Sequence, residues 1–454
     1  MRDLRKKILL ESGKTVSRKA RARPDSHSAS PIASPAPSRG GSALNSRHVS
    51  EEEDNISDSD YNESVANSVA NSEDGDEHIA SWPDKLRDRI AELLDRKRSS
   101  TKGRESCLSA YAHLLRYHYA EEIVDPQLHE LIPALLKCIR AGSTDDETLS
   151  GIRALTMTIF STESDSIYGR VYPSLKSVCQ DSSSASVKVE AIIAMAVSAT
   201  HGGGSMTAAE ELLDFLLEIV ETDGSSIGAD DNAPVVTAAL AAWGFVASNV
   251  ENLQDQSDQA LEAFTDQLDS TDVDVQVAAG KNIALIFEAA RGHDAEEGEE
   301  GEEGEEAPAG ILQYDQHRLV QRMTALVKES SRTVSKKDRR HLHASFRSVL
   351  TSIEHGKGPG YSKAHSQTNN PHTGGTKMAF DGDSLEYGYR ERFRVHNMCV
   401  MIDTWMLSAR LHMLRTVFGG GLFTHYMENP IVKEVLSSAQ VELVPGPSYR
   451  KGRK

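Results

Sequence analysis

The sequence predicts an all-α protein: an armadillo/HEAT-like helical solenoid, preceded by a disordered N-terminal arm and followed by a small, basic, mostly helical C-terminal domain. Three observations predict this fold. Ala-rich apolar helices recur about every 40 to 47 residues, each has a more amphipathic partner, and short polar turns separate them. One helix pair cannot bury its own apolar face, so such pairs stack into a superhelix with an elongated groove.

The Ala-rich helices are the clearest part of this pattern. They read VKVEAIIAMAVSAT (187–200), PVVTAALAAWGFVAS (234–248) and VQVAAGKNIALIFEAA (275–290), and their small residues permit close helix contact. The amphipathic partners are expected at 128–141, 171–180, 208–220, 259–269 and 317–330. The turns STDD, SSSAS, ADDN and STDVD supply Ser, Asp and Asn as helix N-caps. An irregular all-α domain is the alternative.

Composition sets the expected boundaries. Residues 1–80 form a basic and then acidic arm, in which 51–77 hold acidic residues without Lys or Arg, and such a segment cannot form a core. The solenoid is expected over 81–355, with an acidic loop at 292–310. A flexible linker rich in Gly, Pro and Asn follows at 356–382, then the C-terminal domain at 383–440 and a basic tail at 441–454.

Several classes of protein are disfavoured by the chain as a whole. No run of about 18 or more apolar residues occurs, so we expect no membrane span. The apolar stretch near the N-terminus, Ile8 to Leu10, is far shorter than a secretory signal needs, so we expect no export. The cysteines are scattered without a CxxC pair, which favours reduced, buried thiols over a zinc site or disulfides. They are Cys107, Cys138, Cys179 and Cys399.

No catalytic motif is present. The SGKT stretch (12–15) resembles the end of a phosphate-binding loop, but Ile8 stands where that loop needs glycine. The GGG stretches at 202–204 and 419–421 lack dinucleotide-binding spacing and are interpreted as helix breaks. His341, His343 and His355 lie on or beside a basic helix and are interpreted as surface groups rather than metal ligands. We therefore expect no enzyme activity, cofactor, metal or small-molecule substrate.

Charge is strongly segregated along the chain. The formal net charge is -18, yet residues 317–454 hold 22 Lys and Arg against 11 Asp and Glu. Residues 1–316 hold 28 against 57. This segregation indicates a polyanionic partner for the C-terminal part.

A basic helix at 335–356 presents part of this charge. Ser335 and Asp338 form a capping-box-like start. At 100° per residue, an apolar arc and a cationic stripe fall on different faces. The arc consists of Leu342, Phe346, Val349, Leu350 and Ile353, and the stripe of Lys336, Arg340, His343 and Arg347. We expect the arc, through Phe346, to anchor the helix on the preceding helix pair while the stripe, with Lys337, contacts RNA phosphates.

Two further cationic surfaces are candidates. In YRERFRV (389–395) an extended backbone would place Arg390, Arg392 and Arg394 on one side. The tail SYRKGRK adds Arg450, Lys451, Arg453 and Lys454. A solvated face without a partner is the alternative for each patch taken alone.

Two stretches carry a family resemblance. SKKDRRHLHASFRSVLTSIE (335–354) and the segment 385–436, which includes the IDTW sequence (402–405), resemble the C-terminal signature of the interferon-related developmental regulator family. The helical repeats of about 84–330 are similar to the family's armadillo-like domain. The resemblance implies a non-enzymatic regulator that acts through binding, either as a nuclear transcriptional co-regulator or as a ribosome-associated factor that holds ribosomes inactive.

We accordingly expect a cytoplasmic regulator that binds the ribosome and rRNA through its basic C-terminal region, with protein partners in the solenoid groove. The alternative is a nuclear scaffold that binds transcription factors in the groove, with SRKARAR (17–23) as an import signal. Ser50, Ser57 and Ser59 lie beside acidic residues, so we also expect phosphorylation to make the arm more negative and to let it compete with RNA for the basic surface. The alternative is an arm that only keeps the protein in solution.

Overall fold

The computed structural model describes residues 81–95, 99–250, 252–298, 315–329, 335–360 and 391–443. The predicted N-terminal arm, most of the acidic loop, most of the linker and residues 444–454 lie outside the described residues. The predicted domain boundaries therefore remain predictions.

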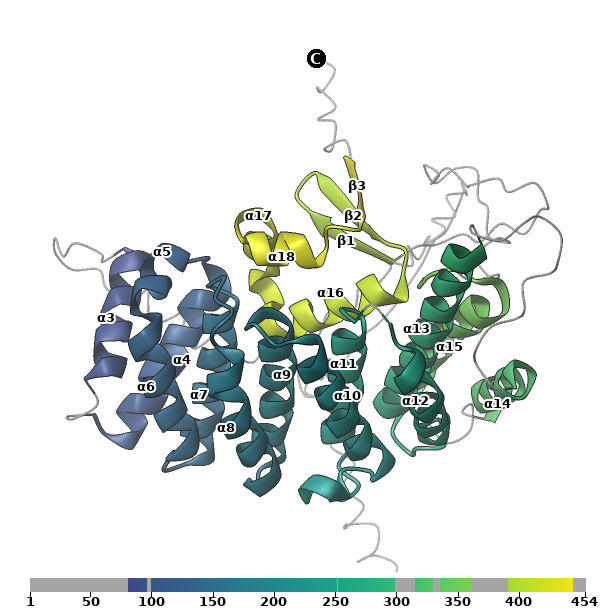
Figure 1. Cartoon of the computed structure of the whole chain (residues 1–454), viewed down its shortest axis with the longest axis horizontal. Helices are drawn as coiled ribbons and strands as arrows, with labels where there is room; N and C mark the ends of the chain where they lie inside the picture. The colour runs from purple at the N-terminus through teal and green to yellow at the C-terminus, as the bar shows by residue number, and fades with distance from the viewer. Residues whose placement is uncertain are drawn as a thin grey trace, which may run out of the picture. The chain divides into compact units, whose positions relative to one another are not determined.

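Helix pairs follow one another along the chain, from the purple to the green part of Figure 1. The pairs are α3 (Trp82–Leu94) with α4 (Thr101–Tyr117), α6 (Leu128–Arg140) with α7 (Asp145–Ile159), α8 (Tyr168–Asp181) with α9 (Ala185–His201), α10 (Met206–Glu221) with α11 (Ala233–Ala247), α12 (Gln254–Gln267) with α13 (Val273–Gly298), and α14 (Gln316–Glu329) with α15 (Lys336–His355). Single turns α5 (Glu121–Val124), η4 (Asp125–Gln127) and η5 (Ser225–Ile227) lie between them. The predicted helical solenoid is confirmed.

The second helices of the pairs stack directly on one another, and we call α4, α7, α9, α11, α13 and α15 the inner helices. Their small residues make this stacking close, as the sequence predicted. A Cβ atom on Gly244 of α11 would lie 2.4 Å from Oδ1 of Asn282 on α13. The Asn282 amide in turn donates to the Leu240 carbonyl at 2.8 Å, so a glycine here lets neighbouring pairs hydrogen-bond side by side.

Polar contacts between pairs follow the repeat period. Five of these contacts join partners that are 39 to 47 residues apart, which is close to the spacing of the Ala-rich helices. These contacts are Arg104 with Glu147, Tyr111 with Thr158, Lys188 with the Ile227 carbonyl, Gln267 with the Val220 carbonyl, and Asn282 with the Leu240 carbonyl.

The polar turns cap the inner helices in most of the predicted places. Thr144 accepts from the Glu147 amide at 3.1 Å, and Asn232 accepts from the Val235 amide at 3.2 Å. Asp272 accepts from the Asp274 amide at 2.9 Å. The SSSAS turn differs, because Ser184 stands at the N-cap of α9 without a side-chain cap bond. There the serines organise the turn itself, with Ser182 accepting from the Ser184 amide at 3.1 Å.

Residues 391–443, which we call the C-terminal segment, combine helices with a small antiparallel sheet. Its elements are β1 (Glu391–Val395), β2 (Met398–Ile402), α16 (Trp405–Phe418), η7 (Gly419–Gly421), α17 (Leu422–Glu428), α18 (Pro430–Val435) and β3 (Gln440–Leu443), with strand order β1-β2-β3. In Figure 1 the yellow α16 crosses the row of inner helices, and it contacts α4, α11 and α13.

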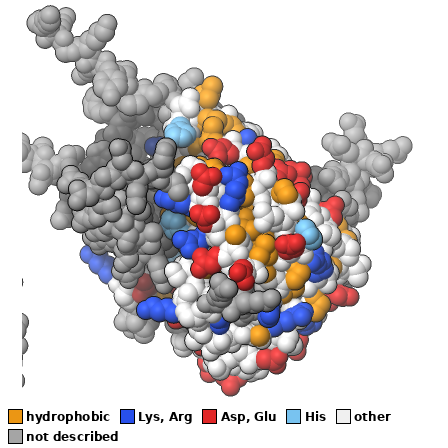
Figure 2. Space-filling model, turned by 90° about the vertical axis from the view of Figure 1, so that its left-hand side faces the viewer, with side chains coloured by type: hydrophobic (Ala, Val, Ile, Leu, Met, Phe, Trp, Pro, Cys, Tyr) orange, Lys and Arg blue, Asp and Glu red, His pale blue; other side chains and the backbone are white. Residues whose placement is uncertain are grey.

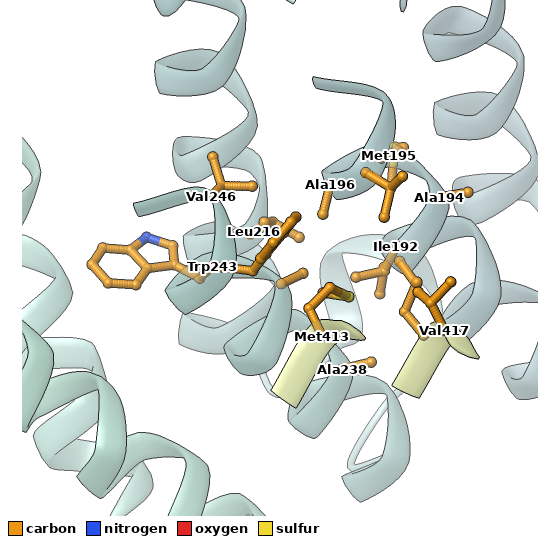
Figure 3. Close-up of a cluster of buried hydrophobic side chains, with 14 of the residues drawn as sticks. Ile192, Ala194, Met195, Ala196, Leu216, Ala238, Trp243, Val246, Met413 and Val417 are labelled. Atoms are coloured by element: carbon orange, nitrogen blue, oxygen red, sulfur yellow. The ribbon is translucent and has the colours of Figure 1, made fainter. Parts of the chain in front are cut away.

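The C-terminal segment shares its core with the solenoid. Met413 and Val417 of α16 extend into a buried apolar cluster that also contains Ile192 of α9 and Ala238 of α11 (Figure 3). A hydrogen bond also joins the solenoid to the main chain of the segment, because the Arg116 side chain of α4 donates to the Phe418 carbonyl. The row of inner helices is therefore covered along part of its length by the chain's own C-terminal segment.

Candidate functional site

The basic helix α15 begins where the sequence predicted. The Ser335 hydroxyl accepts from the Asp338 amide at 3.2 Å and donates to the Asp338 carboxylate at 2.6 Å. The aspartate also places a negative charge in the first turn, where the helix dipole favours it. Gly356, with a φ of 61°, ends the helix in the left-handed conformation.

The predicted apolar arc of α15 is its buried face. Leu342, Phe346, Val349 and Ile353 are at most 1% exposed, and Leu350 is half-buried. The Phe346 ring packs on α13 at Gly280, where an added Cβ would lie 3.1 and 3.2 Å from two ring atoms. Phe346 therefore packs on α13 at a position without a side chain, and its predicted role as the anchor on the preceding pair is confirmed.

The predicted cationic stripe faces away from the core. Lys336, Lys337, Arg340 and Arg347 are exposed, and His343 is half-buried. Among the described residues, none of the four exposed cations has an ion-pair partner. Their charges are consequently not neutralised by the described part of the fold.

The predicted arginine alternation is partly described. β1 is extended, and its register pairs Arg392 with Met401 and Arg394 with Cys399, which places both arginines on one face of the sheet. Arg394 is exposed and Arg392 half-buried. Arg390 lies outside the described residues, as do Arg450, Lys451, Arg453 and Lys454.

The start of β1 and the first cations of the stripe lie near opposite ends of α15. The Glu391 amide at the start of β1 donates to the Pro359 carbonyl, just beyond the C-terminal end of α15. The Trp405 indole donates to the Ser352 hydroxyl at 2.7 Å, in the last turns of the same helix. Lys336 precedes Ser352 by 16 residues, or about 24 Å along the helix axis. The C-terminal segment thus meets α15 at the end remote from most of its cations.

Sequence reasoning missed the side chains that join the C-terminal segment to the solenoid. Arg410 of α16 donates to the carbonyl of Ser248, at the end of α11, and to the Ser248 hydroxyl at 3.3 Å. It also donates to the Val435 carbonyl of α18 at 3.4 Å. Burial lowers the pKa of the Arg410 guanidinium, and helix-end carbonyls, which carry partial negative charge, surround it.

His425 of α17 and Asn429 form a second connection. The His425 ring is fully buried, its Nε2 donates to the Leu115 carbonyl of α4 at 2.9 Å, and its Nδ1 accepts from the Asn429 amide at 3.2 Å. Burial lowers the pKa of His425 to about 4, although its backbone hydrogen bonds oppose this shift. The ring is therefore neutral near pH 7, with its proton on Nε2.

Asn429 connects three helices. Its side-chain amide also donates to the Phe160 carbonyl at the end of α7, at 2.8 Å. Its side-chain oxygen accepts from the Ile431 amide at 2.9 Å, which caps α18. A signal for this role was present in the sequence, because asparagine followed by proline is typical of a helix N-cap and N1 position.

Glu288 of α13 caps the N-terminus of α16. Its carboxylate accepts from the Trp405 amide at 2.8 Å and from the Met406 amide at 3.1 Å, at the N-terminus of α16. Burial raises the pKa of Glu288 to about 7, against the effect of these two hydrogen bonds. A carboxylate at a helix N-terminus is favourable for the dipole, so this group couples α13 to α16.

The described residues contain no group of three or more His, Cys, Asp and Glu side chains that could hold a metal ion. Cys107, Cys138, Cys179 and Cys399 are free and buried, as predicted. Burial raises the pKa of the Cys107 and Cys179 thiols to about 12, so they are protonated near pH 7. None of the described helices combines the length and the hydropathy that crossing a membrane requires.

Stacked helix pairs, a basic last helix and a C-terminal segment laid across the inner helices define an α-solenoid repeat protein. The chain belongs to the interferon-related developmental regulator family, whose sequence model matches residues 49–354. The match ends in the last turn of α15, so it includes the basic helix.

Relatives in fungi and animals are similar over most of this chain. An uncharacterized protein of Schizosaccharomyces pombe is 26% identical over 78% of this chain and 74% of its own length. Interferon-related developmental regulator 1 of Homo sapiens is 21% identical over 77% of this chain and 70% of its own length. Interferon-related developmental regulator 2 of Mus musculus is 22% identical over 79% of this chain and 73% of its own length.

Proposed function

We propose that this protein is a non-enzymatic regulator that associates with ribosomes by binding rRNA phosphates and represses translation or holds it inactive. The observation that carries the proposal is the division of α15 into two faces. One face is buried against α13 through Phe346, while the other exposes Lys336, Lys337, Arg340 and Arg347. A rigid helix that presents cations without internal partners is suited to contact a regular array of phosphates.

The physics of this contact predicts a strong dependence on salt. Each cation that neutralises a phosphate releases condensed counterions, so affinity falls steeply as salt rises, without discrimination between base sequences. Arg394 of β1 offers a second contact point, because β1 begins beside Pro359, beyond the C-terminal end of α15, whereas Lys336 lies at the other end of that helix. Two contact points at a distance favour a large, rigid polyanion such as a folded rRNA surface.

The inner helices are less suited to partner binding than the exposed face of α15. Contacts from α16 already cover part of α11 and α13. A Cβ atom added to Gly244 of α11 would lie 3.8 Å from the Cβ atom of Ala409 on α16. A peptide at this place would have to displace the chain's own helix. This geometry favours the ribosome-binding proposal over a scaffold that uses the same face of the solenoid.

Charge reversal of the stripe tests the proposal. The triple variant Lys336→Glu, Arg340→Glu and Arg347→Glu should keep its melting temperature, because exposed charges change stability by less than about 1 kcal/mol each. Its co-sedimentation with ribosomes in sucrose gradients at low salt should fall, with a shallower salt dependence for the fraction that remains.

A matched control reverses three exposed lysines in the first pairs, with Lys85→Glu, Lys102→Glu and Lys137→Glu. The net charge changes equally, but Lys and Arg are interspersed with Asp and Glu on the face at this end of the molecule (Figure 2). The control should still co-sediment. Full co-sedimentation of the stripe variant, or an equal loss in both variants, would contradict the proposal.

A further inference from the structure

The C-terminal segment makes contacts that a repeat protein does not normally have. In a solenoid each pair contacts only its neighbours, so the ends are connected only through the pairs between them. Here α4 is bonded to residues about 300 positions later: Arg116 donates to the Phe418 carbonyl at 2.9 Å, across 302 residues, and His425 donates to Leu115 across 310 residues. The same segment reaches α15 through Trp405 and Ser352.

At the first pairs the approach is close enough to require glycine. A Cβ on Gly421 would lie 1.8 Å from the Arg116 carbonyl oxygen, which no real side chain tolerates. Gly420 next to it differs, because its Cβ would meet only the Tyr117 side chain at 3.7 Å. The two adjacent glycines therefore provide a disruptive position and a matched neutral one.

The contacts use the chemistry of helix ends. The last carbonyls of an α-helix have no intrahelical partners and carry partial negative charge. The C-terminal segment supplies donors to three of the inner helices at these places: His425 at the end of α4, Asn429 at the end of α7 and Arg410 at the end of α11. At α13 the polarity is reversed, because Glu288 caps the N-terminus of α16. The segment is thus bonded along the row and not at one point.

We propose that the C-terminal segment is a strut that fixes the first helix pairs relative to α15 and so sets the curvature of the solenoid. A rigid α16 of 14 residues spans about 21 Å of this connection. Release at the α4 end removes a constraint on α15, which the same segment contacts through Trp405. The proposal of a strut does not depend on what α15 binds, so its test is separate from the test of ribosome binding.

A distance measurement between the two ends tests the strut. Spin labels are attached to the full chain at Ala91→Cys in α3 and Ala344→Cys in α15, both exposed positions. The native cysteines are buried and leave the introduced thiols as the reactive ones. Pulsed electron–electron double resonance should give a narrow distribution of distances between the two labels when no other substitution is present.

Gly421→Val is then added to release α17 from α4, with Gly420→Ala as its control. Hydrogen exchange of α17 and α18 reports release. The strut predicts faster exchange in these helices together with a broader, shifted distance distribution for Gly421→Val, and neither change for Gly420→Ala.

Faster exchange with an unchanged distance distribution would overturn the proposal, because the helix pairs would then keep their arrangement without the segment. Unchanged exchange in Gly421→Val would overturn the docking on which the strut depends. An equal broadening in Gly420→Ala would also count against it. If Gly421→Val loses helical circular dichroism, Gly421→Ala, which places only a methyl group against the Arg116 carbonyl, replaces it under the same criteria.

Discussion

Replacing Phe346 with alanine isolates the buried face of α15 from its charged face. The ring is fully buried, and truncation of a buried phenylalanine costs about 3 to 5 kcal/mol in transfer free energy and cavity formation. We expect the upper half of that range. One reason is that Gly280, which packs against the ring, has no side chain that could move into the space left by it.

The loss should be concentrated in α15. Because a repeat protein departs from two-state unfolding, the informative assay is hydrogen exchange of the amides from Leu342 to Ile353, supported by urea unfolding followed by circular dichroism. Arg347→Ala is the matched control, since it truncates the neighbouring exposed side chain and should change the free energy of unfolding by less than about 0.5 kcal/mol. Exchange in α15 should increase in Phe346→Ala alone.

A reciprocal substitution checks the contact itself. Gly280→Ala places a methyl group 3.1 Å from the Phe346 ring, where overpacking costs about 1 to 3 kcal/mol and the better helix propensity of alanine returns about 1 kcal/mol. In a Phe346→Leu background the methyl group should be less unfavourable, so the two substitutions should couple. The anchoring argument fails if Phe346→Ala costs less than about 1 kcal/mol while α15 keeps its protection.

Three other outcomes are expected. Glu288 has a pKa raised from 4.5 to about 7, so the folded state favours its protonated form by about 3 kcal/mol at most. This contribution to the free energy of unfolding is complete below pH 4.5 and lost as the pH rises through 7, and urea unfolding of Glu288→Gln should lack this loss. His425 has a pKa lowered from 6.5 to about 4, so its contribution is present above pH 6.5 and lost as the pH falls through 4; the acid side of the stability profile should flatten in His425→Gln. Deletion of residues 1–80 should strengthen RNA binding at low salt, measured by fluorescence anisotropy, and unchanged affinity with or without phosphorylation of the arm would remove support for competition.

Local signals in the sequence predicted the solenoid well. Apolar periodicity located the inner helices α9, α11 and α13, and the polar turns located caps such as Thr144 and Asn232. The two faces of α15 followed from a helical wheel, because the apolar residues that are buried against the neighbouring helix recur at helical spacing within α15 itself. In each of these cases the residues that interact are a few positions apart or one repeat apart.

The interactions of the C-terminal segment could not be predicted in this way. The GGG stretch at 419–421 was interpreted only as a helix break, which is correct for Gly419, where φ is 48°. Gly421 has a different requirement, since it lies against the Arg116 carbonyl of a helix about 300 residues earlier. No spacing rule connects these positions, because the contact depends on how the stacked pairs place α4 in space.

The folding contacts of α15 also bear on the meaning of its charges. Its buried face is held by α13, and its C-terminal end is bonded by Trp405 and by Arg291, which donates to the Ile353 carbonyl. None of these contacts involves Lys336, Arg340 or Arg347, and no described acid pairs with them. Any polar residue with good helix propensity would satisfy the fold at those three positions. The contacts that hold α15 therefore do not require positive charge at these three positions, so charge reversal should leave the fold intact, whereas Phe346→Ala should destabilise it.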